Sequence, residues 1–287
     1  MGNGSYNTNS RQTRAQSSGY FTQSAEKIFE SRSVFKGMSP VGLKFRECCD
    51  NADHLFTLPI AFNLDVTGSM GVIPADLVKH GLPTIMDTFH KKGLKDATLC
   101  FLGIGDHNSD RGPLQVGQFE ADDEKLDHWL TKVYIEKGGG ANGGESYFLA
   151  WYAAARHMKT DAWDKRNQKG FLFTVGDEPC HKGISAEELC DITELAYEKG
   201  FTAKEILAEA QQRWHVYHLN LNRATDDGWN DLLGENNIKV NNYRDIPNLL
   251  PEIVLHHYKA NAEPAHIPTV EAEGCDNPPE FKPSILL

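Results

Sequence analysis

The sequence predicts an α/β protein in which a mainly parallel sheet is covered by helices on both faces. Short apolar segments of strand length alternate with longer amphipathic segments along most of the chain. Strands that are apolar throughout are typical of parallel sheets, because both faces of such a sheet are buried. Of the 287 residues, 40% are hydrophobic and 24% are charged, which is enough apolar material for one large core.

The segments follow one another in the order that a doubly wound sheet requires. The run 58–64 (LPIAFNL) predicts the first strand, and Pro74 begins a helical pattern at 74–92. Further strands are expected at 97–105, 114–119, 170–176 and 214–221. The segment 114–119 predicts a shorter strand in which polar and apolar residues alternate, and the sheet is expected to include one short antiparallel edge strand. Further helices are expected at 122–135, 145–157, 186–199 and 203–213, near Trp229 and at 247–258.

The two ends of the chain differ in composition from its centre. Of the first 24 residues, 17 are Gly, Ser, Asn, Thr or Gln, which predicts an arm that is disordered unless a partner orders it. We therefore divide the chain into a polar arm and accessory segment at 1–54, an α/β domain at 55–260, and a Pro-rich tail at 261–287.

The charge and the hydropathy exclude several classes of partner. The net charge of −11 argues against a nucleic-acid surface, which needs clustered cations. No apolar run approaches the roughly 20 residues that span a bilayer, and the start does not resemble a signal peptide, so we expect a cytoplasmic protein without a membrane partner. An acidic group at the start of the helix 122–135 is expected to face solvent and the positive end of the helix dipole. It consists of Glu120, Asp122, Asp123, Glu124 and Asp127.

Oxygen-bearing side chains follow the buried strands at the points where ligands bind to open α/β sheets. Asp65, Thr67 and Ser69 stand at alternate positions after the first strand, and Asp177 follows the strand 170–176. Mg²⁺ prefers such oxygen ligands in octahedral geometry. Because the two hydroxyls are neutral, an ion held here would keep positive charge and attract a further anion. Asp106 and Asp110 flank another loop of the same edge, where they would either tune the ion or form an ordinary turn.

The pattern Asp65-x-Thr67-x-Ser69-Met70 resembles the metal-ion-dependent adhesion site of von Willebrand factor A domains. The resemblance covers about residues 58–221 and implies a Rossmann-like, doubly wound sheet. It also implies that Asp65, Thr67 and Ser69 bind a metal, with Asp177 reached through water. In the middle loop, Gly143-Gly144-Glu145-Ser146 resembles a variant branch of the family, so either Glu145 or Ser146 would be the ligand there. Within the family, the chain is most similar to bacterial and phage A-domain proteins.

Other sites are less consistent with the sequence. The glycine run 138–144 lacks the Lys-Ser or Lys-Thr of a phosphate-binding loop, which leaves a mobile loop as the better interpretation. Val66 interrupts the Asp-Thr-Gly-Ser signature of aspartic proteases, and no second copy exists. Cys180 and His181 are two adjacent ligands where a structural zinc site needs four.

The sequence therefore predicts a binding module without enzymatic activity, in which Mg²⁺, or alternatively Mn²⁺ or Ca²⁺, coordinates an acidic residue of a partner protein. The resemblance implies an ATPase or a multi-subunit assembly as the partner. Two alternatives stay open. The first is an assembly protein that acts through its terminal arms, and the second is a metal-assisted phosphohydrolase that would use Asp65 and Asp177 with His107 or His181.

Overall fold

A computed structural model describes residues 2–19, 22–29, 31–136, 143–221 and 228–260. The Pro-rich tail predicted at 261–287 and most of the glycine run lie outside the described residues. Within those ranges, no helix combines the length and the apolarity that crossing a bilayer requires.

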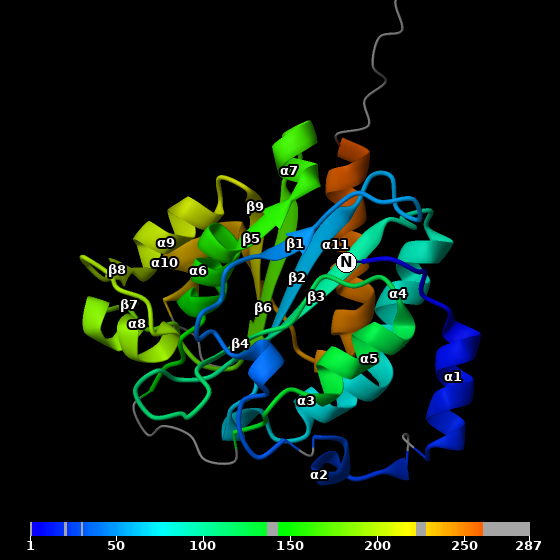
Figure 1. Ribbon diagram of the computed structural model, residues 1–287, viewed down its shortest axis with the longest axis horizontal. Helices are drawn as coiled ribbons and strands as arrows, with labels where there is room; N and C mark the ends of the chain where they lie inside the picture. The colour runs from blue at the N-terminus through cyan, green and yellow to red at the C-terminus, as the bar shows by residue number, and fades with distance from the viewer. Residues whose placement is uncertain (1, 20–21, 30, 137–142, 222–227, 261–287) are drawn as a thin grey trace, which may run out of the picture.

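The centre of the molecule is a six-stranded sheet with the strand order β10-β9-β6-β2-β3-β4 (Figure 1). Its strands are β2 (Leu58–Asp65), β3 (Ala97–Ile104), β4 (Leu114–Val116), β6 (Gly170–Gly176), β9 (Trp214–Asn220) and β10 (Asn237–Lys239). All neighbours pair in parallel except β3 and β4, which pair antiparallel. The predicted doubly wound sheet with a short antiparallel edge strand is therefore confirmed.

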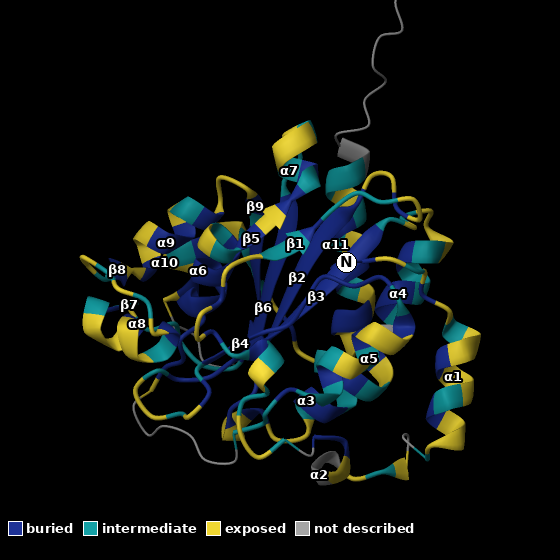
Figure 2. Cartoon of the chain, in the orientation of Figure 1, coloured by how far each residue is buried: buried dark blue, intermediate teal, exposed yellow. Residues whose placement is uncertain are grey.

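Helices cover both faces of this sheet (Figures 1 and 2). One face carries α3 (Ile73–Asp76), α4 (Leu82–Lys91), α5 (Asp123–Thr131) and α11 (Ile246–Ala260), and the other carries α6 (Phe148–His157), α8 (Ala186–Thr193), α9 (Ala203–Ala210) and α10 (Trp229–Leu233). A hydrophobic core lies on each face of the sheet, and successive residues of β2 point to opposite faces. Phe62 packs into the core on the first face and Ala61 into the core on the second. Because β2 is buried on both faces, the sheet is fixed rigidly beneath the loops that follow its strands.

Two predicted helices differ from their expected extent: one contains a widened turn, and the other ends early. The pattern at 74–92 forms α3 and α4 with a wider π-helical turn, Leu77–Gly81, between them. Pro83 has no amide hydrogen to donate four residues back, and a widened turn accommodates that loss. The helix expected at 186–199 ends at Thr193, because Glu194 adopts a positive φ of 55°.

Several short elements have no clear sequence signal. They are β1 (Arg46–Cys48) paired with β5 (Met158–Thr160), β7 (Gly183–Ile184) paired with β8 (Phe201–Thr202), the strand β10, and the helices α2 (Ala25–Ile28) and α7 (Asp161–Arg166). Strands of two or three residues are too short to show a period.

The N-terminal arm differs from its predicted disorder, because it folds against the domain. Its helix α1 (Thr8–Ser17) lies beside α5 (Figure 1). Arg11 is 2% exposed and its Nε lies 2.8 Å from Asp127, while Arg14 pairs with Asp123 and Asp127. The acidic residues Asp123 and Asp127 of α5 therefore hold the arm. The expectation that the acidic group faces solvent is wrong for Glu120 and Asp123, which are both buried.

Candidate functional site

The predicted metal ligands lie where the direction of winding of the sheet changes. The chain runs from β2 outward to β3 on one side, and later adds β6 on the other side of β2. The loops after β2 and β6 therefore leave neighbouring strands in opposite senses and form a crevice at their carboxyl ends. Asp65 is the last residue of β2, and Asp177 follows the last residue of β6.

Four of the predicted side chains lie in one connected group, which we call the oxygen cluster: Asp65, Thr67, Ser69 and Asp177. The Thr67 hydroxyl donates to Oδ1 of Asp65 at 2.6 Å and lies 3.2 Å from the Ser69 hydroxyl. The Ser69 hydroxyl in turn donates to Oδ1 of Asp177 at 2.9 Å. The structure thus brings together side chains that are 108 residues apart in the chain.

The backbone of the first loop holds these side chains in place. The amide of Thr67 donates to Oδ1 of Asp65 at 2.9 Å, which closes a tight turn immediately after the strand. A 3₁₀ turn, Gly68–Met70, follows, and Gly71 ends it with a φ of 54°, which favours glycine. Met70 is buried in the core beneath the loop, so Ser69 is left exposed at the surface.

Tyr147 is a further member of the site that the sequence analysis did not single out. Its hydroxyl donates to Oδ2 of Asp65 at 2.7 Å, so both carboxylate oxygens of Asp65 are engaged. Gly176 allows this approach, because a Cβ atom there would lie 1.9 Å from the Tyr147 hydroxyl oxygen. Tyr147 comes just before an apolar helix, and nothing in that pattern separates a tyrosine that packs from one that also binds a carboxylate.

The two candidates for the middle-loop ligand have different surroundings. Glu145 does not begin a helix, but pairs as a bridge with Cys180 beside the loop that contains Asp177. Its Oε2 is buried, and no donor in the described part of the chain reaches it. The Ser146 hydroxyl instead lies 2.5 Å from Nδ1 of His107 and accepts from the His107 amide at 2.9 Å.

The acidic groups of the site lack a compensating charge from the protein. Burial raises the pKa of Asp65 to about 6, although hydrogen bonds from Thr67 and Tyr147 favour its anionic form. Burial, and after it the negative charge of Asp65, raises the pKa of Glu145 to about 9. In the ranges that the structure describes, no Lys or Arg forms an ion pair with Asp65, Glu145 or Asp177.

These residues fit a hard divalent cation. Buried carboxylates without a cationic partner are costly, and a bound ion would compensate both Asp65 and the orphaned oxygen of Glu145. The donors of the oxygen cluster are carboxylate and hydroxyl oxygens, which suit Mg²⁺, Mn²⁺ or Ca²⁺ better than softer ions.

The strand order and the short antiparallel edge strand agree with the doubly wound sheet that the resemblance to von Willebrand factor A domains implies. No protein-family model matches the chain, and no curated protein matches its sequence. Solved structures similar to it include the pilus adhesin SpaC from Lactobacillus rhamnosus GG in its open conformation, with 8% identity and a TM-score of 0.48 over 74% of this chain. This chain spans 31% of the SpaC chain, about a third of its length.

Two further structures show the same distant similarity. The von Willebrand factor type A protein from Catenulispora acidiphila is 8% identical over 69% of this chain and 42% of its own, with a TM-score of 0.42. The vWF domain of the type V pili tip protein Mfa5 from Porphyromonas gingivalis is 8% identical over 71% of this chain and 96% of its own, with a TM-score of 0.46.

Proposed function

We propose that this chain is a metal-dependent protein-binding module, in which a divalent cation held by Asp65, Thr67 and Ser69, with Asp177 through water, coordinates an acidic residue of a partner protein. The observation that carries the proposal is the oxygen cluster itself. Its carboxylate and hydroxyl side chains come from two neighbouring strands and lie in contact at the carboxyl edge of the sheet.

The charge distribution supports a role for the cation in recruiting an anion. Asp65 is buried and Asp177 partly exposed, while Thr67 and Ser69 contribute neutral oxygens. A divalent ion on this set would keep net positive charge toward the exposed side, where Ser69 lies. A carboxylate of a partner is the ligand that such an ion attracts. An ATPase or a multi-subunit assembly, the partners that the resemblance implies, could present a surface Asp or Glu of this kind.

Glu145 distinguishes this site from one with hydroxyl ligands only. Its buried carboxylate would add negative charge near the ion and weaken the attraction for a partner's acid group. We propose Glu145, whose Oε2 has no donor in the described residues, as the middle-loop group that faces the ion, and Ser146 as a support for His107.

The proposal also holds that the site binds without turnover and that the protein works in the cytoplasm. A panel of phosphate esters with Mg²⁺ or Mn²⁺ tests the first point, and we expect no release of phosphate above that of the Asp65→Asn variant. Release that depends on Asp65 would favour the phosphohydrolase alternative instead.

Mn²⁺ offers a direct test, because the relaxation rate of water protons reports the water molecules bound to the ion. We expect wild-type protein to bind one Mn²⁺, and Mg²⁺ to displace it. Adding a short peptide with a single Glu should lower the relaxivity of the bound Mn²⁺, because the carboxylate replaces a water ligand. The same peptide with Gln is the control probe and should change nothing.

Two variants decide whether the oxygen cluster is responsible. Asp65→Asn should lose Mn²⁺ binding, whereas Asp191→Asn, on the exposed surface of α8, should bind as wild type does. Equal Mn²⁺ binding by Asp65→Asn and wild type would refute the proposed site. A relaxivity that the Glu peptide does not change would refute carboxylate recognition but leave the metal site intact.

A further inference from the structure

A second group of metal-ligating side chains lies on the same edge of the sheet, outside the oxygen cluster. Asp106 and His107 follow β3, and His181 follows β6. Each of these residues offers one ligand atom, and the three atoms lie within 4.8 Å of one another. Among the described His, Cys, Asp and Glu residues, this is the one group of three that meets this limit. We propose that Asp106, His107 and His181 form a site for a transition-metal ion of the Zn²⁺ type.

The distances suit shared coordination of one ion. Nε2 of His181 lies 3.0 Å from Oδ1 of Asp106, and Nδ1 of His107 lies 3.8 Å from the same oxygen. Two ligands that are each roughly 2.0–2.2 Å from a Zn²⁺ ion must themselves lie about 3 to 4 Å apart. The side chains could therefore take an ion with small movements only.

The carboxylate and one imidazole are held before any ion binds. Asp106 has no exposed surface, and its Oδ1 accepts from the amide of Asn108 at 3.0 Å while Oδ2 accepts from Ser109 at 3.0 Å. The His107 side chain is 4% exposed and contacts the Ser146 hydroxyl through Nδ1. Ser146 thus positions the His107 ring through the same nitrogen that faces Asp106, and this contact would have to open for Nδ1 to bind an ion.

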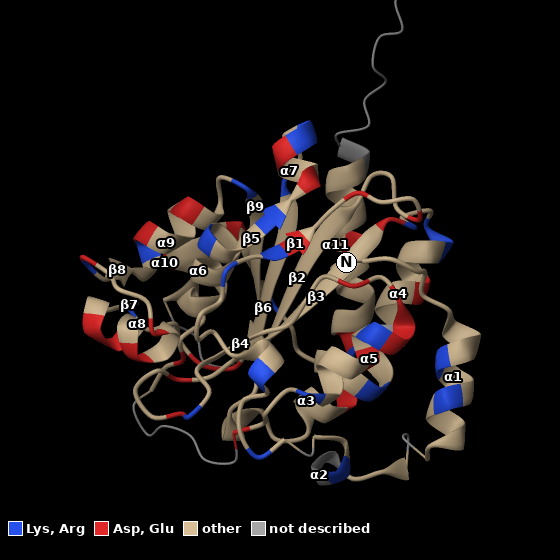
Figure 3. Ribbon diagram, viewed as in Figure 1, with Lys and Arg blue, Asp and Glu red and all other residues tan. Residues whose placement is uncertain are grey.

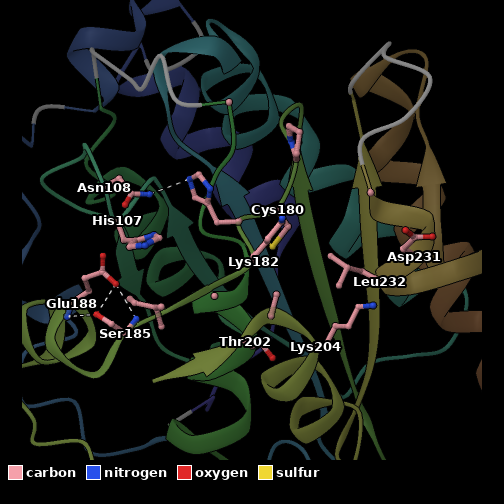
Figure 4. A pocket seen from close by; sticks show the side chains of 17 residues that line it. His107, Asn108, Cys180, Lys182, Ser185, Glu188, Thr202, Lys204, Asp231 and Leu232 are labelled. Carbon is pink, nitrogen blue, oxygen red and sulfur yellow. Dashed lines mark hydrogen bonds between the residues drawn. The ribbon is translucent and has the colours of Figure 1, made fainter. Parts of the chain in front are cut away.

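The third ligand, His181, faces a cavity of about 1060 Å³ that His107 and Asn108 also line. Figure 4 shows His107 and Asn108 on one side of this cavity and Lys204, Asp231 and Leu232 on the other. Three protein ligands beside an open space are the arrangement of zinc sites that keep a position free, whereas a structural zinc site closes around four ligands. The free position would admit water or an anionic small molecule.

The donor set separates this site chemically from the oxygen cluster. Two imidazoles with one carboxylate favour Zn²⁺ and its first-row neighbours, whereas Mg²⁺ prefers oxygen ligands alone. Sequence reasoning paired His181 with its neighbour Cys180, but the structure pairs it with Asp106 and His107, which lie some 75 residues earlier. The proposal does not depend on the proposed function, because no residue is shared between the two sites.

Competition with a fluorescent zinc chelator, in the presence of excess Mg²⁺, tests the site in the full chain. We expect one Zn²⁺ per wild-type chain, and at least about 10-fold weaker binding after His181→Gln or Asp106→Asn, since even loss of an outer support costs 10- to 100-fold. His80→Gln, which changes a histidine that is 57% exposed, is the matched control and should bind Zn²⁺ as wild type does. Asp65→Asn should also retain Zn²⁺, which separates this result from the test of the oxygen cluster.

A spectroscopic measurement on wild-type protein covers the case in which a variant fails to fold. Co²⁺ added to the protein should give the strong visible absorption of a four- or five-coordinate ion with nitrogen ligands, and Zn²⁺ should abolish it. A spectrum as weak as that of the hydrated ion would overturn the proposal. Zn²⁺ binding that folded His181→Gln and Asp106→Asn retain at wild-type affinity would overturn it equally, and would leave these contacts as hydrogen bonds that join two loops.

Discussion

Asp65 illustrates how a buried carboxylate is maintained in this protein. Three donors, the amide and hydroxyl of Thr67 and the hydroxyl of Tyr147, contact its two oxygens and favour the anion. Desolvation has the larger effect and raises the pKa of Asp65 to about 6. The donors therefore orient the carboxylate without fully compensating its charge, which is the condition in which a bound cation contributes most.

Removing the tyrosine hydroxyl should weaken the fold measurably. Tyr147→Phe leaves Oδ2 of Asp65 without its donor, and we expect unfolding free energy to fall by about 1.5–3 kcal/mol, as for hydrogen bonds to charged groups. Urea unfolding at neutral pH in the presence of chelator measures the change. Tyr258→Phe, near the end of α11, is the control and should unfold at the same urea concentration as wild type. If Tyr147→Phe also unfolds at that concentration, the hydrogen bond to Asp65 does not contribute to stability.

Glu145 should oppose folding whenever it is ionised and no metal is bound. The pKa of Glu145 in the folded protein is about 9, so the side chain is ionised above this pH. Glu145→Gln removes that charge, and we therefore expect the variant to have a higher unfolding free energy than wild type above pH 9 when chelator is present. The same variant should gain less stability from Mg²⁺ than wild type does. Thermal unfolding with and without 5 mM Mg²⁺ measures both effects. The role of Glu145 is contradicted if the variant is no more stable than wild type in chelator at high pH. It is also contradicted if Mg²⁺ raises the melting temperature of the variant as much as that of wild type.

At the scale of elements, the arm and α5 show how opposite charges order a polar segment. Composition predicted disorder for residues 1–24, yet Arg11 and Arg14 of α1 pair with Asp123 and Asp127 of α5. In Figure 3, basic residues lie on α1 and acidic residues lie on the neighbouring helix α5. The arm also buries Tyr6, so it contributes apolar contact as well as charge. Composition alone reveals neither the opposite charges on α5 nor the apolar contact of Tyr6.

Arg11→Met tests this attachment. Methionine keeps most of the apolar stem of the side chain but leaves Asp127, which is 25% exposed, without its closest cation. We expect a loss of about 2 kcal/mol in unfolding free energy, near the middle of the range for hydrogen bonds to charged groups, together with faster proteolysis of the arm. Arg32→Met, at an exposed position, should change neither property. An arm as resistant to protease in Arg11→Met as in wild type would contradict the contribution of the ion pair.

The main strands and helices were predictable because each is long enough to show its period. The segments 58–64, 97–105, 170–176 and 214–221 correspond closely to β2, β3, β6 and β9. The predicted helix ends were wrong at two places. Glu194 adopts a positive φ that ends α8 early, and Glu145 forms a bridge with Cys180 instead of beginning a helix. Both features depend on contacts with distant segments, and one sequence does not display them.

For the whole molecule, we expect the acidic edge of the sheet to make the unfolding free energy depend on pH and on metal. The folded pKa of Asp65 and of Glu145 lies above the ordinary value for each group, so the folded chain holds these protons more tightly than the unfolded chain does. Unfolding free energy without metal therefore decreases as pH rises from about 4 to 9, over the range that these two shifts span.

On the proposed function, Mg²⁺ should reverse this trend, because it would bind the ionised groups. We expect Mg²⁺ to raise the melting temperature more at pH 8.5 than at pH 5, where binding must displace protons. Mg²⁺ at about 100 times its Kd would add roughly 2.7 kcal/mol. Differential scanning calorimetry in Mg²⁺ and in chelator at the two pH values measures this difference, with Asp65→Asn as the control. An equal gain at both pH values would show that Mg²⁺ does not bind at these carboxylates.

The sequence by itself determined the doubly wound sheet and pointed to Asp65, Thr67, Ser69 and Asp177, because period, strand length and the residues that follow strands are local properties of the chain. Only the tertiary structure brought Tyr147 to Asp65, attached the arm to α5, and placed His181 beside Asp106 and His107. These contacts join segments far apart in the chain. They depend on how loops turn after their strands and on which charges are left uncompensated once the core has formed.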